Sequence, residues 1–318
     1  MNSPFMMSNY AHAGDVLSFA ETCLSNGERC ALAAVIDTDG GGVRAPGALM
    51  CVSESGRQAG YVSNGCVDAD VVMNAKEAIA QNTSRRIVYG RGSPFLDVKL
   101  PCGGRIELLI IANPDVAAIR SAVATLAKRE PVCLTLSESG LSISSTAYEA
   151  TAWRGDVLGL TLVPKPRLRI AGRGAEPVAL ARLANASDMT TLVQSPDESS
   201  LSLARSMGLP AMALSVPDHP PSIHDDPWTA FVLMFHDHDW EPGLLEQALA
   251  GSAFYIGALG SRKTHDLRCE TLRDRGMDEA SIRRIRGPIG LIKQSRDASL
   301  LAVSTLAEIA EAYQELNP

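Results

Sequence analysis

The sequence has no pair of cysteines separated by two residues, and its seven cysteines are odd in number and scattered along the chain. Structural zinc sites commonly take ligands from such pairs, and disulfide frameworks are typical of short secreted chains with an even number of cysteines. We therefore expect reduced thiols, with neither a structural zinc site nor disulfides. Reduced thiols indicate a cytoplasmic protein.

The sequence also lacks an apolar run long enough to span a bilayer, and its first residues, MNSPFMMSNYAHAG, lack the basic and apolar regions of a signal peptide. Basic residues are in deficit, with 29 Lys and Arg against 36 Asp and Glu, a net charge of −7. This balance argues against a general nucleic-acid or anionic-membrane binder. We expect no partner of either kind.

What the chain does have is length and apolar content. Its 318 residues, 46% of them hydrophobic, suggest two domains of about 150 residues each. Residues 1–163 mix helical and strand patterns, which predicts a small α+β domain. Residues 164–318 repeat an apolar strand, a glycine turn and a helix, which predicts a doubly wound parallel sheet resembling a Rossmann fold. Pro164 and Pro166 mark the join.

A cysteine stands at a strand–turn–helix junction in the first half. Asn64-Gly65 is a turn signal, Cys66 follows it, and VDADVVMNAKEAIA then shows apolar residues at helical spacing. Free N–H groups and the helix dipole favour a thiolate or another anion at such a start, whereas Asp68 and Asp70 oppose a second negative charge. Cys66 is therefore either a functional thiol or a small buried residue in a core.

A glycine turn opens the second half. The stretch Gly172-Arg173-Gly174-Ala175-Glu176-Pro177 follows a predicted strand and begins a predicted helix, as in dinucleotide-binding turns. Pro177 replaces the third glycine. The ribose-binding carboxylate expected about 20 residues later is missing, because that region contains Gln194 and only a late Asp197. The turn therefore indicates the fold more strongly than it indicates NAD(P) binding. Two alternatives stay open: the turn binds a different nucleotide, or it is kept for the fold and binds no nucleotide.

Two further stretches should lie at the same rim, beyond the carboxyl ends of parallel strands. Gly260-Ser261-Arg262-Lys263 offers a hydroxyl, two cations and helix N–H groups, which suit a phosphate better than a merely solvated turn. His236-Asp237-His238-Asp239 follows the apolar run FVLMF. Two loop histidines are more typical of polar ligand contacts or a helix start than of a metal centre, so we predict no metal.

Together these motifs resemble the XdhC/CoxI family, the accessory proteins of xanthine dehydrogenase and related molybdenum hydroxylases. The similarity includes Ser63-Asn64-Gly65-Cys66-Val67, Cys102-Gly103-Gly104, the histidine pair and Phe254 to Arg262, in the family's order over roughly residues 15–315. Asn64 stands where the family usually has glycine, and Gln194 stands where many members have an acidic residue.

The resemblance implies a chaperone that holds the molybdenum cofactor (molybdopterin), supports replacement of an oxo ligand by sulfur, and inserts the cofactor into an apo-hydroxylase similar to xanthine dehydrogenase. A cysteine desulfurase is the implied sulfur donor, and we expect a homodimer. Cys66 and Cys102 are the implied soft contacts near molybdenum, and Cys66 is the candidate catalytic thiol. The implied cofactor-binding residues are Asn64, Gly65, Cys66, Cys102, Gly103, Gly104, Gly172, Gly174, His236, His238, Gly260, Ser261, Arg262 and Lys263.

Two rival functions stay open at this point. The first is an NAD(P)-dependent oxidoreductase that uses Gly172 and Gly174. The second is a chaperone that holds the apo-enzyme without touching the cofactor. We expect cofactor insertion rather than turnover of a metabolite.

Overall fold

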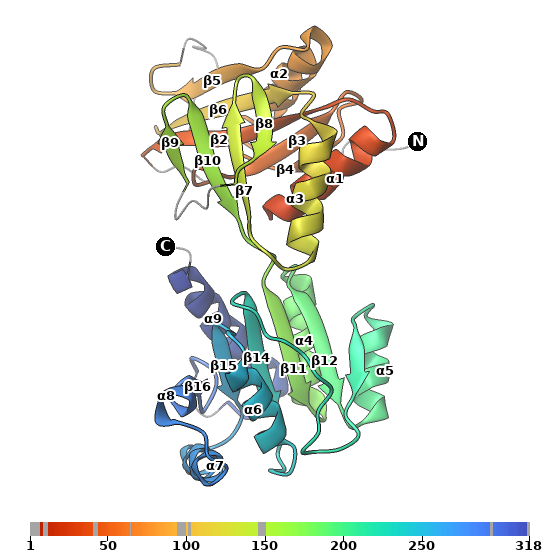
Figure 1. Cartoon of the computed structure of the whole chain (residues 1–318), viewed down its shortest axis with the longest axis vertical. Helices are drawn as coiled ribbons and strands as arrows, with labels where there is room; N and C mark the ends of the chain where they lie inside the picture. Colours follow the sequence, from red (N-terminus) through yellow and green to blue (C-terminus); the bar gives the residue numbers. More distant parts are fainter. Residues whose placement is uncertain are drawn as a thin grey trace. The chain divides into compact units, whose positions relative to one another are not determined.

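The structure, a computed structural model, describes residues 7–8, 12–40, 44–63, 65–93, 100, 103–145, 151–292 and 295–316. Asn64 and Cys102 therefore lie outside the described residues. The chain divides into two compact units, Met1–Pro164 and Lys165–Pro318 (Figure 1). Each unit has its own sheets and its own cores.

The first unit contains a six-stranded sheet in the order β1-β4-β3-β2-β6-β5. Its strands pair antiparallel except for β1 with β4. Their bounds are β1 (Met7–Ser8), β2 (Cys30–Asp39), β3 (Leu49–Ser53), β4 (Gln58–Gly60), β5 (Arg85–Gly90) and β6 (Arg105–Ala112). The first seven residues of β2 are all buried, because helices cover both faces of the sheet.

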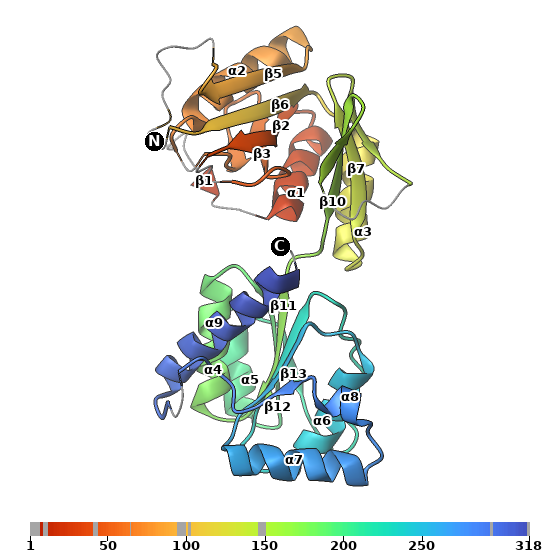
Figure 2. The ribbon, with the colours of Figure 1, turned by 90° about the vertical axis from the view of Figure 1, so that its left-hand side faces the viewer.

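Helix α2 (Asp68–Gln81) packs on one face of this sheet, and α1 (Ala13–Ser25) packs on the other (Figure 2). The buried residues of α2 recur at helical spacing, as the sequence predicts: Val71, Ala75, Ala78 and Ile79. The core on the α1 side also includes α3 (Val116–Ala127) and a four-stranded sheet. That sheet has the order β8-β7-β10-β9 and consists of β7 (Val132–Ser137), β8 (Gly140–Ile143), β9 (Ala152–Arg154) and β10 (Val157–Leu162).

The second unit is a six-stranded parallel sheet in the order β13-β12-β11-β14-β15-β16. Its strands are β11 (Arg167–Gly172), β12 (Thr190–Ser195), β13 (Ala211–Ala213), β14 (Thr229–Met234), β15 (Tyr255–Ala258) and β16 (Ile285–Arg286). The order reverses between β11 and β14, as in dinucleotide-binding folds, so ligands are expected beyond the carboxyl ends of these two strands.

Helices cover both faces of the parallel sheet, which confirms the doubly wound prediction. One core includes α4 (Ala175–Ala186), α5 (Glu198–Ser206) and α9 (Ala298–Leu316). The other includes α6 (Glu241–Ala250), α7 (Arg262–Asp274) and α8 (Glu279–Ile282). Figure 2 shows α4 and α9 on one side of the sheet and α6 and α8 on the other. Within the described ranges, no helix is long and apolar enough to cross a membrane.

Candidate functional site

The loop between β4 and α2 presents Cys66 to solvent. The interpretation of Cys66 as a buried core residue is therefore wrong. The buried carboxylate of Asp68 organises this loop. It accepts hydrogen bonds from the backbone N–H groups of Val62, Ser63 and Gly65 and from the Ser63 hydroxyl, at 2.6 to 3.1 Å. These three backbone N–H groups thus already face the chain's own carboxylate.

Several glycine loops of the first unit lie at the same sheet edge as Cys66. Strands β2, β4 and β5 run in one direction, so the loops that leave them share this edge with the loop that enters β6. Gly90 and Gly104 approach so closely that a Cβ on Gly90 would lie 2.1 Å from the Gly104 carbonyl oxygen. Gly103 precedes this contact with a φ of 69°. The predicted residues Cys66, Gly103 and Gly104 thus gather at one edge.

A hydrogen bond ties the start of α2 to the end of β5. The Tyr89 hydroxyl donates to Asp70 Oδ2 at 2.6 Å. Burial and this hydrogen bond raise the pKa of Tyr89 far above its ordinary value, so the phenol stays a donor. The tie fixes the first turn of α2, and with it Cys66, relative to the glycine loops.

In the second unit, the predicted glycine turn joins β11 to α4. A Cβ on Gly172 would lie 2.5 Å from the Met234 carbonyl oxygen, so only glycine allows β11 and β14 to approach at their ends. Gly174 has a φ of 92° and precedes the first residue of α4. The turn therefore has the backbone form that the sequence predicts.

Two side-chain pairs join this turn to the loop after β14. His236 Nε2 lies 3.1 Å from Glu176 Oε1, and Arg173 Nη1 lies 3.5 Å from Asp237 Oδ2. An ionised carboxylate only accepts hydrogen bonds, so the His236 imidazole donates to Glu176. Among the described side chains, no three histidines, cysteines or carboxylates form a metal site.

The side chains around the turn do not fit NAD(P). The Glu176 carboxylate lies against the turn, with its Oε2 3.5 Å from the position that a Cβ on Gly174 would take. A pyrophosphate at this helix start would therefore meet a negative charge where it needs positive charge. Gln194 is fully buried and accepts a hydrogen bond from Arg169 at 2.9 Å. Asp197 is the N-cap of α5. Neither of these two side chains is placed as a ribose ligand.

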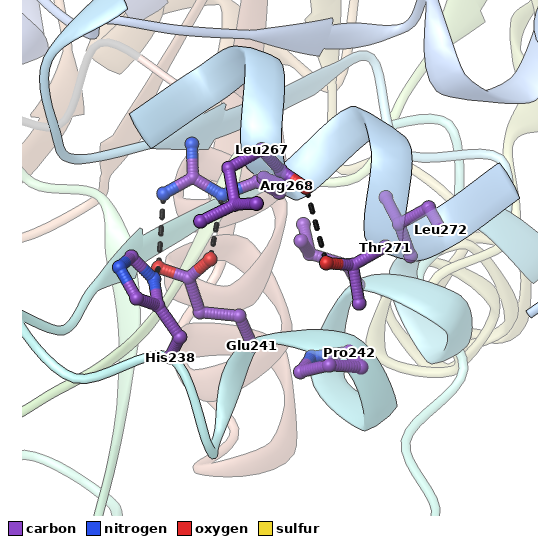
Figure 3. A pocket seen from close by; sticks show the side chains of 8 residues that line it. His238, Glu241, Pro242, Leu267, Arg268, Thr271 and Leu272 are labelled. Carbon is purple, nitrogen blue, oxygen red and sulfur yellow. Dashed lines mark hydrogen bonds and ion pairs between the residues drawn. The ribbon is translucent and has the colours of Figure 1, made fainter. Parts of the chain in front are cut away.

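His238 belongs to a network between α6 and α7 (Figure 3). Its Nδ1 lies 3.4 Å from Glu241 Oε1, and buried Arg268 donates two hydrogen bonds to the Glu241 carboxylate, at 2.8 and 2.9 Å. Arg268 also donates to the Leu259 carbonyl oxygen at the end of β15. A cavity of about 60 Å³ adjoins the network, with Pro242 and aliphatic side chains in its walls. The network fixes His238 near the carboxyl ends of the parallel strands, where ligands are expected.

The turn after β15 keeps its cations exposed. Ser261 is the N-cap of α7, and its hydroxyl oxygen accepts from the Thr264 backbone N–H at 3.1 Å. Arg262 and Lys263 extend into solvent from the first turn, and neither forms an ion pair with a described residue. Gly260 adopts a φ of 140° at the turn itself. Two positive charges and the start of a helix are thus open to an anionic ligand.

Local sequence patterns do not mark Glu176, Glu241 or Arg268 as site residues. Arg268 lies in a strongly polar helix, so its position in the sequence gives no sign that it is buried. Glu176 stands in the first turn of a predicted helix, where acidic residues are common, so its position does not indicate a site. Their roles become visible only in the folded chain, where β14 beside β11 brings His236 to Glu176 and the packing of α7 against α6 brings Arg268 to Glu241.

Comparisons with known proteins agree with this architecture. The XdhC and CoxI family matches residues 23–90, and the XdhC Rossmann domain matches residues 168–309. The molybdenum cofactor insertion chaperone PaoD of Escherichia coli (strain K12) is 34% identical over 296 residues, which cover 93% of this chain and 87% of PaoD. The chain belongs to the XdhC and CoxI family.

The crystal structure of a xanthine dehydrogenase from Bacillus halodurans has the same fold as this XdhC-family chain. The TM-score is 0.74 at 20% sequence identity, with 94% of this chain and 96% of that chain covered. Gly65 and Cys66 fall within the first matched family segment, and the rim residues from Gly172 to Lys263 fall within the second. Gly103 and Gly104 lie outside both segments.

Proposed function

We propose that this XdhC-family chain binds the molybdenum cofactor as cargo and inserts it into an apo-molybdenum hydroxylase. The exposed Cys66 thiol carries the proposal. It projects from a loop held by Asp68, at the sheet edge where Gly90 and Gly104 approach each other closely. Thiolates are soft ligands that suit molybdenum. The likeness to PaoD, which is named for cofactor insertion, supports the same reading.

The finer parts of the proposal concern sulfur and partners. The proposed sulfuration replaces an oxo ligand of the cofactor held at Cys66: thiols reduce the persulfide of a cysteine desulfurase to sulfide, the sulfide takes the place of the oxo ligand, and the oxygen leaves as water. A hydroxylase similar to xanthine dehydrogenase is the proposed client, and a homodimer is the proposed assembly. The NAD(P)-dependent oxidoreductase is the weaker alternative, because the Glu176 carboxylate places a negative charge beside the glycine turn and Gln194 is buried.

The test compares Cys66→Ala with Cys133→Ala, which removes a half-buried thiol from β7. Each purified protein is mixed with molybdenum cofactor, desalted, and measured for retained molybdenum by mass spectrometry. Cys66→Ala should bind the cofactor at least about tenfold more weakly, the equivalent of losing about 1.4 kcal/mol. Its far-ultraviolet circular dichroism should match that of the wild type, because the side chain is exposed.

Equal retention by Cys66→Ala and the wild type would remove the support for the proposal. Loss of retention by Cys133→Ala as well would point to a general effect of thiol removal. Delivery is tested separately, by mixing the loaded chaperone with apo-xanthine dehydrogenase and following the recovery of hydroxylase activity.

A further inference from the structure

Hydrogen-bond acceptors gather at the glycine turn between β11 and α4. Glu176 is about three-quarters buried, and while one of its oxygens meets His236, the other faces the open side of Gly174. Asp237, on the loop after β14, has a side chain about two-fifths exposed that pairs with Arg173 through Oδ2, and its Oδ1 is buried without a hydrogen-bond partner in the part of the chain that the structure describes. A buried acceptor without a donor is costly, so a bound group that supplies donors would be favoured here.

A phosphate is a poor match for the same turn. Glu176 and Asp237 carry two negative charges, against one guanidinium from Arg173. Helix starts bind anions through the free N–H groups of the first turn. Pro177 is the third residue of α4 and has no N–H, so one of these donors is missing.

The geometry points to the Glu176 carboxylate as the recognition site for a flat ring with adjacent N–H donors. The ring we propose is a pterin, bound through its 2-amino-4-oxo edge. That edge offers a ring N–H beside an exocyclic amino group. A carboxylate accepts two parallel donors in this way from a guanidinium. Identification of the ring as the pterin end of the molybdenum cofactor rests on the proposed function.

This assignment separates two subsites along one rim. The acceptors lie at the end of β11, and the exposed cations Arg262 and Lys263 lie at the end of β15. Strand β14 lies between them, so the two subsites are about 10 Å apart, or two strand spacings. A ligand with a donor edge at one end and a phosphate at the other matches this distribution of charge.

The experiment uses two free ring compounds as probes. Pterin carries the 2-amino group, whereas lumazine has an oxygen in its place and lacks the paired donors. Binding of each probe is measured by fluorescence titration with the wild type, Glu176→Gln and Asp237→Asn. Glu198→Gln is the matched control, because Glu198 is an exposed carboxylate in the first turn of α5 in the same unit.

The wild type and Glu198→Gln should prefer pterin over lumazine by roughly tenfold or more, the size expected for a charge-assisted hydrogen bond. Glu176→Gln should lose most of this preference, and Asp237→Asn should lose part of it. The inference is overturned if the wild type does not bind pterin, or if both variants keep the full preference.

Retention of the complete molybdenum cofactor is measured on the same protein samples. If the wild type discriminates pterin through Glu176 but retains no cofactor, the recognition site stands and the proposed function fails. If the wild type retains cofactor while Glu176→Gln still prefers pterin by the same factor, the recognition site fails alone.

Discussion

At the scale of single residues, burial separates cysteines that look alike in the sequence. Cys23, Cys30 and Cys51 lie in the first unit's core, whereas Cys66 is exposed. Burial, followed by the charge of Glu28, raises the pKa of the Cys23 thiol to about 11. Cys23 therefore stays protonated at neutral pH and is a poor ligand, which leaves Cys66 as the accessible thiol of this group.

The exposed cations after β15 lead to a prediction at the same scale. Replacing both Arg262 and Lys263 with Ala should weaken binding of the molybdenum cofactor by roughly a hundredfold, because two charge-assisted hydrogen bonds to its phosphate would be lost. The effect should shrink at high salt, since both side chains are exposed. Titration at low and high ionic strength measures both changes.

The control replaces Arg182 and Arg205, which lie on α4 and α5 away from this turn. This double variant removes the same charge and should bind the cofactor as the wild type does. Unchanged affinity after replacement of Arg262 and Lys263 would mean that the turn is only a solvated basic loop. A parallel titration with an adenine dinucleotide would show whether the rim serves that ligand instead.

At the scale of elements, single carboxylates connect segments that are otherwise linked only by loops. Glu28, just before β2, accepts hydrogen bonds from Ser55 and Arg57 in the hairpin between β3 and β4. Asp68 connects the end of β4 to α2 in the same manner. Each of these loops is therefore held in position by hydrogen bonds to a neighbouring carboxylate.

Glu28 gives a pH dependence of known sign. Burial opposes its ionisation, but hydrogen bonds from Ser55, Arg57 and Ser53 prevail and lower the pKa of the carboxyl from 4.5 to about 2. A lowered folded-state pKa stabilises the fold above pH 4.5, and this stabilisation is lost as the pH falls towards 2. The contribution should be of the order of 1–3 kcal/mol after solvent screening.

Urea unfolding at pH 7 and pH 3 measures this contribution. The wild type should lose more free energy of unfolding between the two values than Glu28→Gln does, by roughly 1 kcal/mol or more. Glu54→Gln is the matched control, because Glu54 binds Arg29 nearby with a more exposed carboxylate. A wild type and a Glu28→Gln variant with identical pH dependence would contradict the assignment.

At the scale of the whole molecule, every sheet and every apolar core cluster formed by the described residues lies within one of the two units. The core clusters of the first unit end at Leu162, and those of the second begin at Leu168. The chain crosses between them through Pro164 and Pro166, which fits a short connection that belongs to neither core. Each unit thus carries the means of its own stability.

Residues 165–318 should therefore fold when expressed alone. We expect a native-like circular dichroism spectrum and a single cooperative unfolding transition, because both faces of the parallel sheet are covered by helices from the same unit. Residues 1–164, expressed separately, provide the comparison. Gradual, non-cooperative unfolding of residues 165–318 would show that the second unit depends on the first.

Local patterns in the sequence determined much of this architecture. The helical spacing of Val71, Ala75 and Ile79 predicted α2, because one face of a helix must be apolar to pack on a sheet. Gly172 and Gly174 predicted the turn from β11 to α4, because only glycine fits the close approach and the positive φ found there. These features depend on residues that are neighbours along the chain.

The chemical character of each site was decided by tertiary structure. Cys66 could be core or surface by sequence, and the Asp68 carboxylate together with the packing of α2 made it exposed. Glu176 and His236 are 60 positions apart, and they meet because β14 lies beside β11 in the sheet. Local sequence sets backbone conformation over a few residues, whereas charge and burial at a site depend on which distant strands pair.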